Sequence, residues 1–177
     1  MIESALSIDG WMEINDLEWL AEQAKTHTAI CEVGSWQGRS ARVLADNTPG
    51  TLWCVDTWAS DTVAADIRCV EGEFAFQKFQ ENLKDHLHSG KVSVLRQPSV
   101  DAAYTMSRAG MSFDMIFIDA DHELSSIRAD ILAWKPLVRS GGLFCGHDSG
   151  YGPIMQALRE LLPNYKNEES MWMVRMP

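Results

Sequence analysis

The sequence lacks long hydrophobic runs and has fewer basic than acidic residues. No apolar stretch among its 177 residues approaches the roughly 20 residues that a membrane-spanning helix needs, so no membrane partner is expected. The first residues, Met1 to Ser4, lack the basic segment and apolar core of a secretion signal. Fifteen Lys and Arg against twenty-five Asp and Glu give a net charge of −10. Such a surface repels phosphates, so nucleic acid is not an expected partner.

Cysteine is also scarce. The four cysteines, Cys31, Cys54, Cys69 and Cys145, show no C-x-x-C spacing, which would indicate a metal or redox site. Three of them lie in apolar runs expected to be buried strands, where cysteine serves as a small apolar side chain. Because disulfide frameworks belong to oxidising compartments, we expect a cytoplasmic protein with reduced cysteines.

The chain length suits a single domain spanning residues 1–177, because a chain of this size buries roughly 70% of its unfolded surface. An amphipathic helix is expected at Glu13–Lys25, within an N-terminal helical region of residues 1–27. Beyond it, apolar runs alternate with helical patterns, which predicts a doubly wound, mostly parallel α/β sheet. The expected strands are Ala29–Gly34, Thr51–Asp56, Val92–Arg96, Phe113–Asp119 and Leu143–His147; the expected helices are Gly38–Asn47, Glu73–His88, Val100–Arg108, Glu123–Trp134 and Pro153–Leu162; an antiparallel hairpin is expected at residues 165–175.

Residues 57–72 form the one irregular stretch, with no clear hydrophobic period. A solvated loop containing some short helix explains it. A lid over a ligand explains it equally well, because long loops in compact domains are often functional. Both interpretations stay open on the sequence alone.

The first motif joins a strand end, a glycine turn and a helix start. It reads E-x-G-x-x-x-G-x-S, with Glu32, Gly34, Gly38 and Ser40. A dinucleotide fingerprint has three glycines at G-x-G-x-x-G, because a pyrophosphate lies against the helix amides. The third glycine is missing here, so an NAD-binding oxidoreductase is the less favoured alternative. Asp56 ends the next apolar run, where a carboxylate can accept both hydroxyls of a ribose.

Three further motifs follow in the second half of the chain. They are F-D-x-I-F-I-D-A-D-H at Phe113–His122, W-x-P-L at Trp134–Leu137 and G-G-x-x-x-G-H-D at Gly141–Asp148. With the first motif, their order and spacing resemble the class I S-adenosylmethionine-dependent methyltransferases. Within that class, the chain resembles the compact family that includes the macrocin-type sugar O-methyltransferases. The resemblance covers roughly residues 28–162.

The resemblance implies an S-adenosylmethionine site beyond the carboxyl ends of the strands, where strand order reverses between the first and fourth strands. Asp56 would hold the ribose, and Gln97 and Ser99 would contact adenine, although Ser99 also suits a helix N-cap. Trp58 would stack on adenine or cover the site, unless it packs in the core. The implied cofactor-binding residues are Glu32, Gly34, Ser35, Gly38, Ser40, Asp56, Trp58, Gln97, Ser99 and Asp119.

The resemblance also implies methyl transfer to oxygen, which needs a deprotonated hydroxyl on the acceptor. Asp121 or His122 would face the acceptor, and His122 is the better base because its unperturbed pKa is near neutral. A divalent metal such as Mg²⁺ would lower the pKa of the acceptor, held by Asp119, His147 and Asp148.

The sequence departs from its relatives at this metal site. Metal-dependent members carry two acidic or amide residues where this chain has His147 and Asp148, and Mg²⁺ rarely takes imidazole. His147 therefore points elsewhere, binds a softer metal, or belongs to a site without metal. A cluster that only hydrogen-bonds the strand tips is a further alternative.

The leading prediction is an S-adenosylmethionine-dependent methyltransferase that acts on a hydroxyl of a sugar, natural product or other small molecule. The alternative is a non-catalytic or partner-dependent cofactor-binding domain, because the short chain leaves little outside the sheet to build an acceptor pocket. A homodimer, the commonest symmetric assembly, would supply the missing wall, whereas a small exposed acceptor would not need one.

Overall fold

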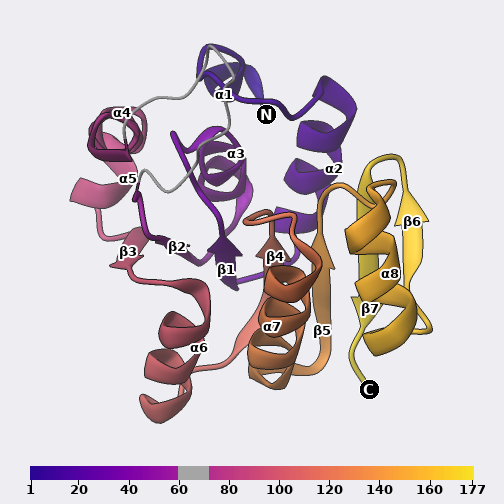
Figure 1. The fold of residues 1–177 in the computed structure, drawn as a ribbon. Coiled ribbons are helices and arrows are strands. Elements are labelled where there is room, and N and C mark those ends of the chain that lie inside the picture. The colour runs from indigo at the N-terminus through magenta and orange to yellow at the C-terminus, as the bar shows by residue number, and fades with distance from the viewer. Residues whose placement is uncertain (60–71) are drawn as a thin grey trace.

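The computed structural model describes residues 1–59 and 72–177. Seven strands of these residues form one sheet in the order β3-β2-β1-β4-β5-β7-β6 (Figure 1). Strands β1 to β5 run parallel, and the β6–β7 hairpin joins β5 in antiparallel fashion. The predicted doubly wound sheet with its closing hairpin is confirmed. The strands are β1 Ala29–Val33, β2 Thr51–Asp56, β3 Val92–Arg96, β4 Phe113–Ile118, β5 Val138–Gly146, β6 Lys166–Glu168 and β7 Met171–Arg175.

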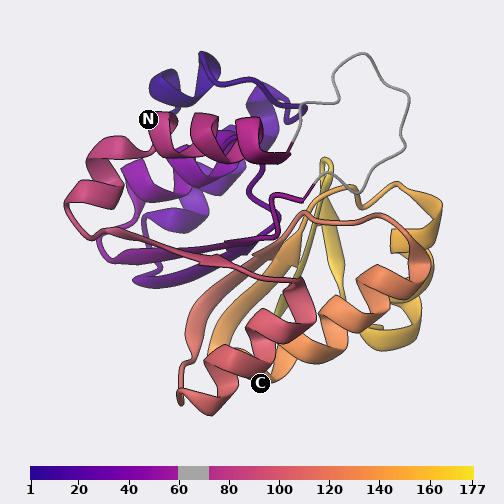
Figure 2. The ribbon, with the colours of Figure 1, turned by 60° about the vertical axis from the view of Figure 1, so that its left-hand side comes forward.

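Helices cover both faces of the sheet, which runs between two sets of them (Figure 2). One set is α1 Glu3–Leu6, α2 Ile14–Ala24, α3 Arg39–Asn47, α4 Gly72–Asn82 and α5 Lys84–His88. The other is α6 Ser99–Arg108, α7 Leu124–Trp134 and α8 Gly152–Leu161, with the short 3₁₀ helix η1 at Lys135–Leu137.

Two apolar clusters hold these layers together, one on each face. Successive side chains of a strand point to opposite faces, so Ile30 packs toward α2 and α3 while Cys31 packs toward α6 and α7. In β4, Met115 and Phe117 join the first cluster, whereas Ile116 joins the second. Strands buried on both faces read as continuous apolar runs, which is why the central strands could be predicted.

The strand order reverses between β1 and β4. Strand β1 pairs with β2 on one side and with β4 on the other, so that Glu32 lies opposite Cys54 and Phe117. At such a reversal the connections leave toward opposite faces and open a crevice beyond the strand ends. The predicted switch point is confirmed.

The structure corrects two predicted elements. The helix predicted at Glu73–His88 is two helices, α4 and α5, broken at Leu83, whose side chain is fully buried. The strand predicted at Leu143–His147 begins at Val138 and ends at Gly146. The N-terminal helical region consists of α1 and α2.

The candidate lid at residues 57–72 falls mainly on residues 60–71, which lie outside the described residues. In the part of the chain that the structure describes, every helix is too short or too polar to cross a bilayer.

Candidate active site

A cavity of about 1390 Å³ opens beyond the carboxyl ends of the central strands. It brings together most of the residues predicted for the site, although they are far apart in the sequence. Its lining includes the predicted cofactor-binding residues Gly34, Ser35, Ser40, Asp56, Trp58, Gln97, Ser99 and Asp119, and the predicted catalytic or metal-binding residues Asp121, His122, His147 and Asp148.

Glu32 lies beneath the glycine turn and does not line the cavity. Its side chain is fully buried, and the Ser35 hydroxyl donates to its Oε2 at 2.5 Å. Its Oε1 has no hydrogen-bond partner among the described residues. Burial raises the pKa of Glu32 to about 7, against the opposing effect of hydrogen bonds from Ser35 and Ser40. Glu32 thus stabilises the glycine turn through Ser35, and its pKa lies close to neutral pH.

Gly34 allows two strand ends to meet. Its φ is +89°, and a Cβ atom at this position would lie 2.0 Å from the carbonyl oxygen of Asp119. Its N–H donates to Val55 O at 2.8 Å, and the N–H of Asp119 donates to Val33 O at 2.8 Å. A side chain here would push β1 and β4 apart exactly where the cavity begins.

Gly38 has a different role in the structure. Its φ is +88°, and a Cβ there would approach Leu83 Cδ2 at 2.5 Å and Phe79 Cδ2 at 3.0 Å. Gly38 therefore faces the α4–α5 layer and does not line the cavity. Its positive φ places it as the left-handed N-cap of α3.

Asp56 binds the backbone of the glycine turn. Its Oδ2 accepts the N–H groups of Ser35 and Trp36, both at 2.9 Å, and its Oδ1 accepts the N–H of Trp58 at 2.8 Å. A carboxylate offers about four lone-pair directions, so one remains for a further donor. Asp56 fixes the shape of the turn in addition to bordering the cavity.

Three tryptophans lie around the turn. The Trp58 indole donates to Trp36 O at 2.7 Å, and its ring packs on Phe76 and Phe79 with centroids 4.7 and 4.9 Å away. Trp58 is thus a core residue that also borders the cavity. Trp36 packs against Trp11 with ring centroids 4.3 Å apart and the two ring planes tilted by 35°, and Trp11 is 56% exposed. The sequence motifs gave no sign of Trp11, because it precedes them by a whole helix.

The strand β3 end lies beside Asp56. The N–H of Gln97 donates to Asp56 O at 3.1 Å. The Ser99 hydroxyl donates to Asp130 Oδ1, and Pro98 is the N-cap of α6. The N-cap interpretation of Ser99 is therefore wrong. Asp130 also lines the cavity and was missed, because nothing in the sequence of α7 distinguishes it from a solvent-facing acid.

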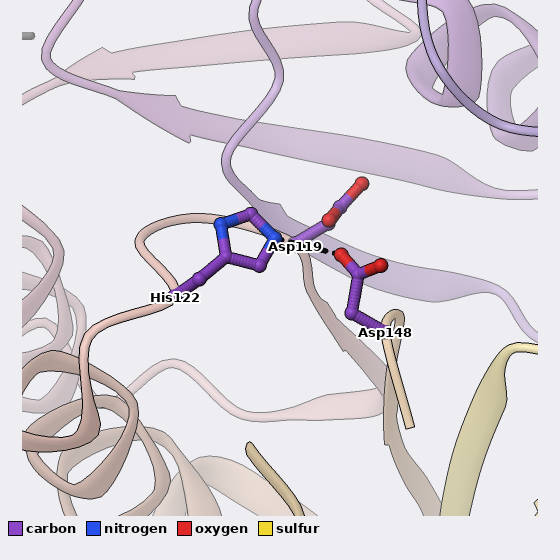
Figure 3. Close-up of side chains that lie close together, drawn as sticks. All are labelled: Asp119, His122 and Asp148. Atoms are coloured by element: carbon purple, nitrogen blue, oxygen red, sulfur yellow. Dashed lines mark hydrogen bonds and ion pairs between the residues drawn. The ribbon is translucent and has the colours of Figure 1, made fainter. Parts of the chain in front are cut away.

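An imidazole–carboxylate cluster borders the other side of the cavity. Asp119 and His122 follow β4, and Asp148 follows β5 (Figure 3). His122 Nε2 lies 2.7 Å from Asp148 Oδ2, and the two side chains point toward each other (Figure 3). This hydrogen bond raises the pKa of His122 and holds the pKa of Asp148 well below its usual range. The pair has the arrangement of a base and the acid that orients it.

Asp121 is held away from such a role by its own loop. Its Oδ2 accepts the Ser126 hydroxyl at 2.6 Å, and its Oδ1 accepts the N–H of Glu123 at 3.2 Å. The Ser126 hydrogen bond is the main reason why the pKa of Asp121 lies below its ordinary value. A carboxylate stabilised in its charged form is a weak base.

His147 lies among three carboxylates. Its Nε2 is 3.2 Å from Asp16 Oδ2 of α2, and its Nδ1 is 3.2 Å from Asp148 Oδ2 and 3.8 Å from Asp119 Oδ1. Burial opposes its charge, but the hydrogen bond to Asp148 and the nearby Asp119 raise the pKa of His147 to about 9. Burial raises the pKa of Asp119 to about 6, opposed by His147.

The predicted metal set of Asp119, His147 and Asp148 does not fit Mg²⁺. Mg²⁺ takes oxygen ligands, whereas both ring nitrogens of His147 face carboxylates as hydrogen-bond donors. The protonated His147 thus already neutralises part of the negative charge of the surrounding carboxylates. Asp119, His122 and Asp148 place one ligand atom each within 4.8 Å of one another, a mixed oxygen and nitrogen set that suits an ion that accepts imidazole, such as Zn²⁺.

Comparison with solved structures finds the same fold in several O-methyltransferases. One from Bacillus cereus, in complex with S-adenosylhomocysteine, is 16% identical with a TM-score of 0.71, over 99% of this chain and 90% of that chain. TomG from Streptomyces achromogenes, in complex with S-adenosylmethionine, is 16% identical with a TM-score of 0.69, over 94% and 82%. The calicheamicin methyltransferase CalS11 is 13% identical with a TM-score of 0.68, over 91% and 77%.

No curated protein matches the sequence. A family profile described as a methyltransferase domain matches residues 31–149, which is more than half of the chain and includes the glycine turn and the imidazole–carboxylate cluster. The resemblance stated from the motifs is confirmed, and this chain belongs to that methyltransferase domain family.

Proposed function

We propose that this protein is an S-adenosylmethionine-dependent O-methyltransferase that acts on a small hydroxylated acceptor such as a sugar or natural product. One observation carries the proposal: a single cavity joins the glycine turn, Asp56 and the His122–Asp148 pair. The first two suit a nucleoside cofactor, and the pair suits proton removal from a hydroxyl. Membership of a methyltransferase family and neighbours bound to S-adenosylmethionine or S-adenosylhomocysteine support the cofactor.

The cavity offers suitable groups for each part of the cofactor. Ser40 lies in the first turn of α3 and lines the cavity, and the N-terminal end of a helix favours a negatively charged group such as the methionine carboxylate. The remaining lone pair of Asp56 can accept a ribose hydroxyl. Gln97 and Ser99 lie beyond Asp56 on the β3 side, where the base would extend. The acidic lining suits the positive sulfonium.

His122 is the proposed general base. Because Nε2 donates to the Asp148 carboxylate, the neutral imidazole keeps its lone pair on Nδ1. Nδ1 accepts the proton as the acceptor oxygen bonds to the methyl carbon. The carbon–sulfur bond breaks, its electron pair stays on sulfur, and S-adenosylhomocysteine is released. Asp148 then stabilises the imidazolium that forms. In this proposed step the His122–Asp148 pair alone moves the proton.

The cavity has an aromatic wall beside the glycine turn. Trp11 and Trp36 contact each other with tilted rings and line the cavity, and Trp11 keeps more than half of its surface exposed. Exposed tryptophan offers a flat apolar face to a ring. This supports a cyclic acceptor, and a sugar or a planar natural product meets that description.

The test is transfer of a labelled methyl group from S-adenosylmethionine to a panel of hydroxylated metabolites. We expect the wild-type protein to label at least one acceptor and to stay active with EDTA. Replacing His122 by Gln should lower the rate about 10²- to 10⁴-fold, the usual contribution of a general base. His88→Gln, the same change at an exposed histidine of α5, should leave the rate unchanged.

Two results would contradict the proposal. Activity that EDTA abolishes and Zn²⁺ or Mn²⁺ restores would make Asp119, His122 and Asp148 a metal site and remove the base role of His122. S-adenosylhomocysteine binding without transfer to any acceptor would favour the alternative of a non-catalytic or partner-dependent domain.

A further inference from the structure

Asp130 is a buried acid in the cavity that the proposed chemistry does not use. It lies on α7, is 4% exposed and lines the same cavity as Asp56 and His122. Buried carboxylates are costly and need a partner. The hydrogen-bond partners of Asp130 therefore indicate which of its carboxylate oxygens is available to a ligand.

Two consecutive hydrogen bonds determine that the side chain of Asp130 accepts, and does not donate, toward Ser99. The Trp134 indole N–H donates to Ser99 Oγ at 2.8 Å, and the Ser99 hydroxyl donates to Asp130 Oδ1 at 2.5 Å. An indole can only donate, so Ser99 must accept from Trp134. The group at 130 that faces Ser99 must then be an acceptor.

The second oxygen is left for the cavity. Asp130 Oδ2 makes no hydrogen bond within the described ranges, yet it is not one of the fully enclosed atoms without a partner. Because the residue lines the cavity, this oxygen can meet a ligand there. Burial raises the pKa of Asp130 to about 6, so at neutral pH the group is mainly a carboxylate and only accepts hydrogen bonds.

The position of Asp130 points to the base of the nucleoside. Ser99 begins α6 directly after β3, whose end is tied to Asp56 by the N–H of Gln97. A ribose at Asp56 would direct its base toward Ser99 and Asp130. The lining there includes the apolar side chains of Pro98, Val100 and Ala129, which suit the flat faces of a purine.

We propose that Asp130 selects adenine, by accepting a hydrogen bond from its exocyclic amino group through Oδ2. This inference rests on the proposed function and adds a specificity residue on α7. A base with a carbonyl oxygen at the same ring position, as in hypoxanthine, would set two acceptors against each other. The site then rejects inosyl analogues, because the buried oxygen loses its donor.

Calorimetric titration with S-adenosylhomocysteine and S-inosylhomocysteine tests this selection. The wild-type protein should bind the adenosyl compound about ten- to a hundredfold more tightly, as expected for a hydrogen bond to a charged group. In Asp130→Asn, Ser99 still needs an acceptor and holds the amide oxygen, so the NH₂ group faces the cavity. The preference should fall at least about tenfold and turn toward the inosyl compound.

Asp101→Asn is the matched control, since it removes the same charge from an exposed position of α6 and should keep the wild-type ratio. A merely structural role of Asp130, joining α6 to α7, would lower stability without changing the ratio. Equal wild-type affinity for both compounds, or an unchanged ratio in a folded Asp130→Asn variant, overturns the inference and leaves the proposed function intact. If that variant fails to fold, the wild-type ratio alone decides. A wild-type protein that binds neither compound refutes the proposed function and this inference with it.

Discussion

Acidic side chains beneath the cavity are buried and have raised pKa values, unlike acids at the protein surface. Glu32 is the clearest example, because it combines full burial with a free oxygen, Oε1. Its hydrogen bonds with Ser35 and Ser40 only partly offset the cost of burial, so the pKa of Glu32 rises from 4.5 to about 7. Between these two values the folded protein keeps a proton that the unfolded chain releases. The contribution of Glu32 to stability therefore declines as pH rises through this window.

Replacing Glu32 by Gln should make stability less sensitive to pH. The wild-type free energy of unfolding should fall between about pH 4.5 and about pH 7, and Glu32→Gln should remove up to about 3 kcal/mol of that fall. Part of the fall in unfolding free energy should remain in the variant, because the pKa values of Asp119, Asp130 and His147 are also raised. Urea unfolding at several pH values measures the effect. Glu18→Gln, at an exposed position of α2, should behave as the wild type; an equal fall in Glu32→Gln and wild type would refute the burial argument.

At the residue scale, the sequence predicts which residues belong to the site better than it predicts their contacts. The motifs identify Gly34 and Asp56, because their positions at strand ends follow from the alternation of elements. Asp56 accepts the N–H groups of Ser35, Trp36 and Trp58. No local sequence pattern predicts these hydrogen bonds, because they depend on the conformation of the loops that follow β1 and β2. Asp130 and Trp11 carry no motif at all, and only the packing of α7 and the N-terminal segment brings them to the cavity.

At the scale of elements, the central strands decide where the cavity opens. The tips of β1 and β4 touch at Gly34, where the backbone of Asp119 leaves no room for a Cβ atom. This contact brings the first motif beside the second, although they lie far apart along the chain.

Replacing Gly34 by Ala should therefore damage both the fold and the site. The added Cβ would lie 2.0 Å from Asp119 O at a φ of +89°, so we expect a loss of more than about 3 kcal/mol in unfolding free energy. Gly150→Ala is the control, since a Cβ there meets nothing within 4 Å, and its change should stay within about 0.5 kcal/mol. Denaturant unfolding of both variants gives the comparison. Similar stabilities would show that the two strand tips can separate freely.

The bounds of β2 and β3 agree with the predicted ones, because apolar runs flanked by breaks leave little choice. The start of β5 was missed because Ser140, Gly141 and Gly142 resemble a turn. In the structure these residues stay in the strand, with an irregular register against β4 and a φ of +75° at Gly141. The break at Leu83 was missed for a related reason, since a helical pattern continues across it.

At the scale of the whole molecule, the topology is what the sequence predicts most fully. Parallel strands connected by helices wind in two directions from β1, and this alone collects the carboxyl ends of β1, β2 and β4 at one crevice. The expected homodimer, the single-domain limits and the cytoplasmic location stay predictions. The acceptor stays a proposal too, and it rests on side chains such as Trp11 that reach the cavity from outside the central motifs.

The central claim is that this crevice binds an adenosyl-sulfur compound. Titration calorimetry of the wild-type protein with S-adenosylhomocysteine, and separately with NADH, tests it most directly. The account predicts saturable binding of S-adenosylhomocysteine, weakened about ten- to a hundredfold in Asp56→Ala, and no binding of NADH. Saturable binding of NADH without any heat from S-adenosylhomocysteine would contradict it.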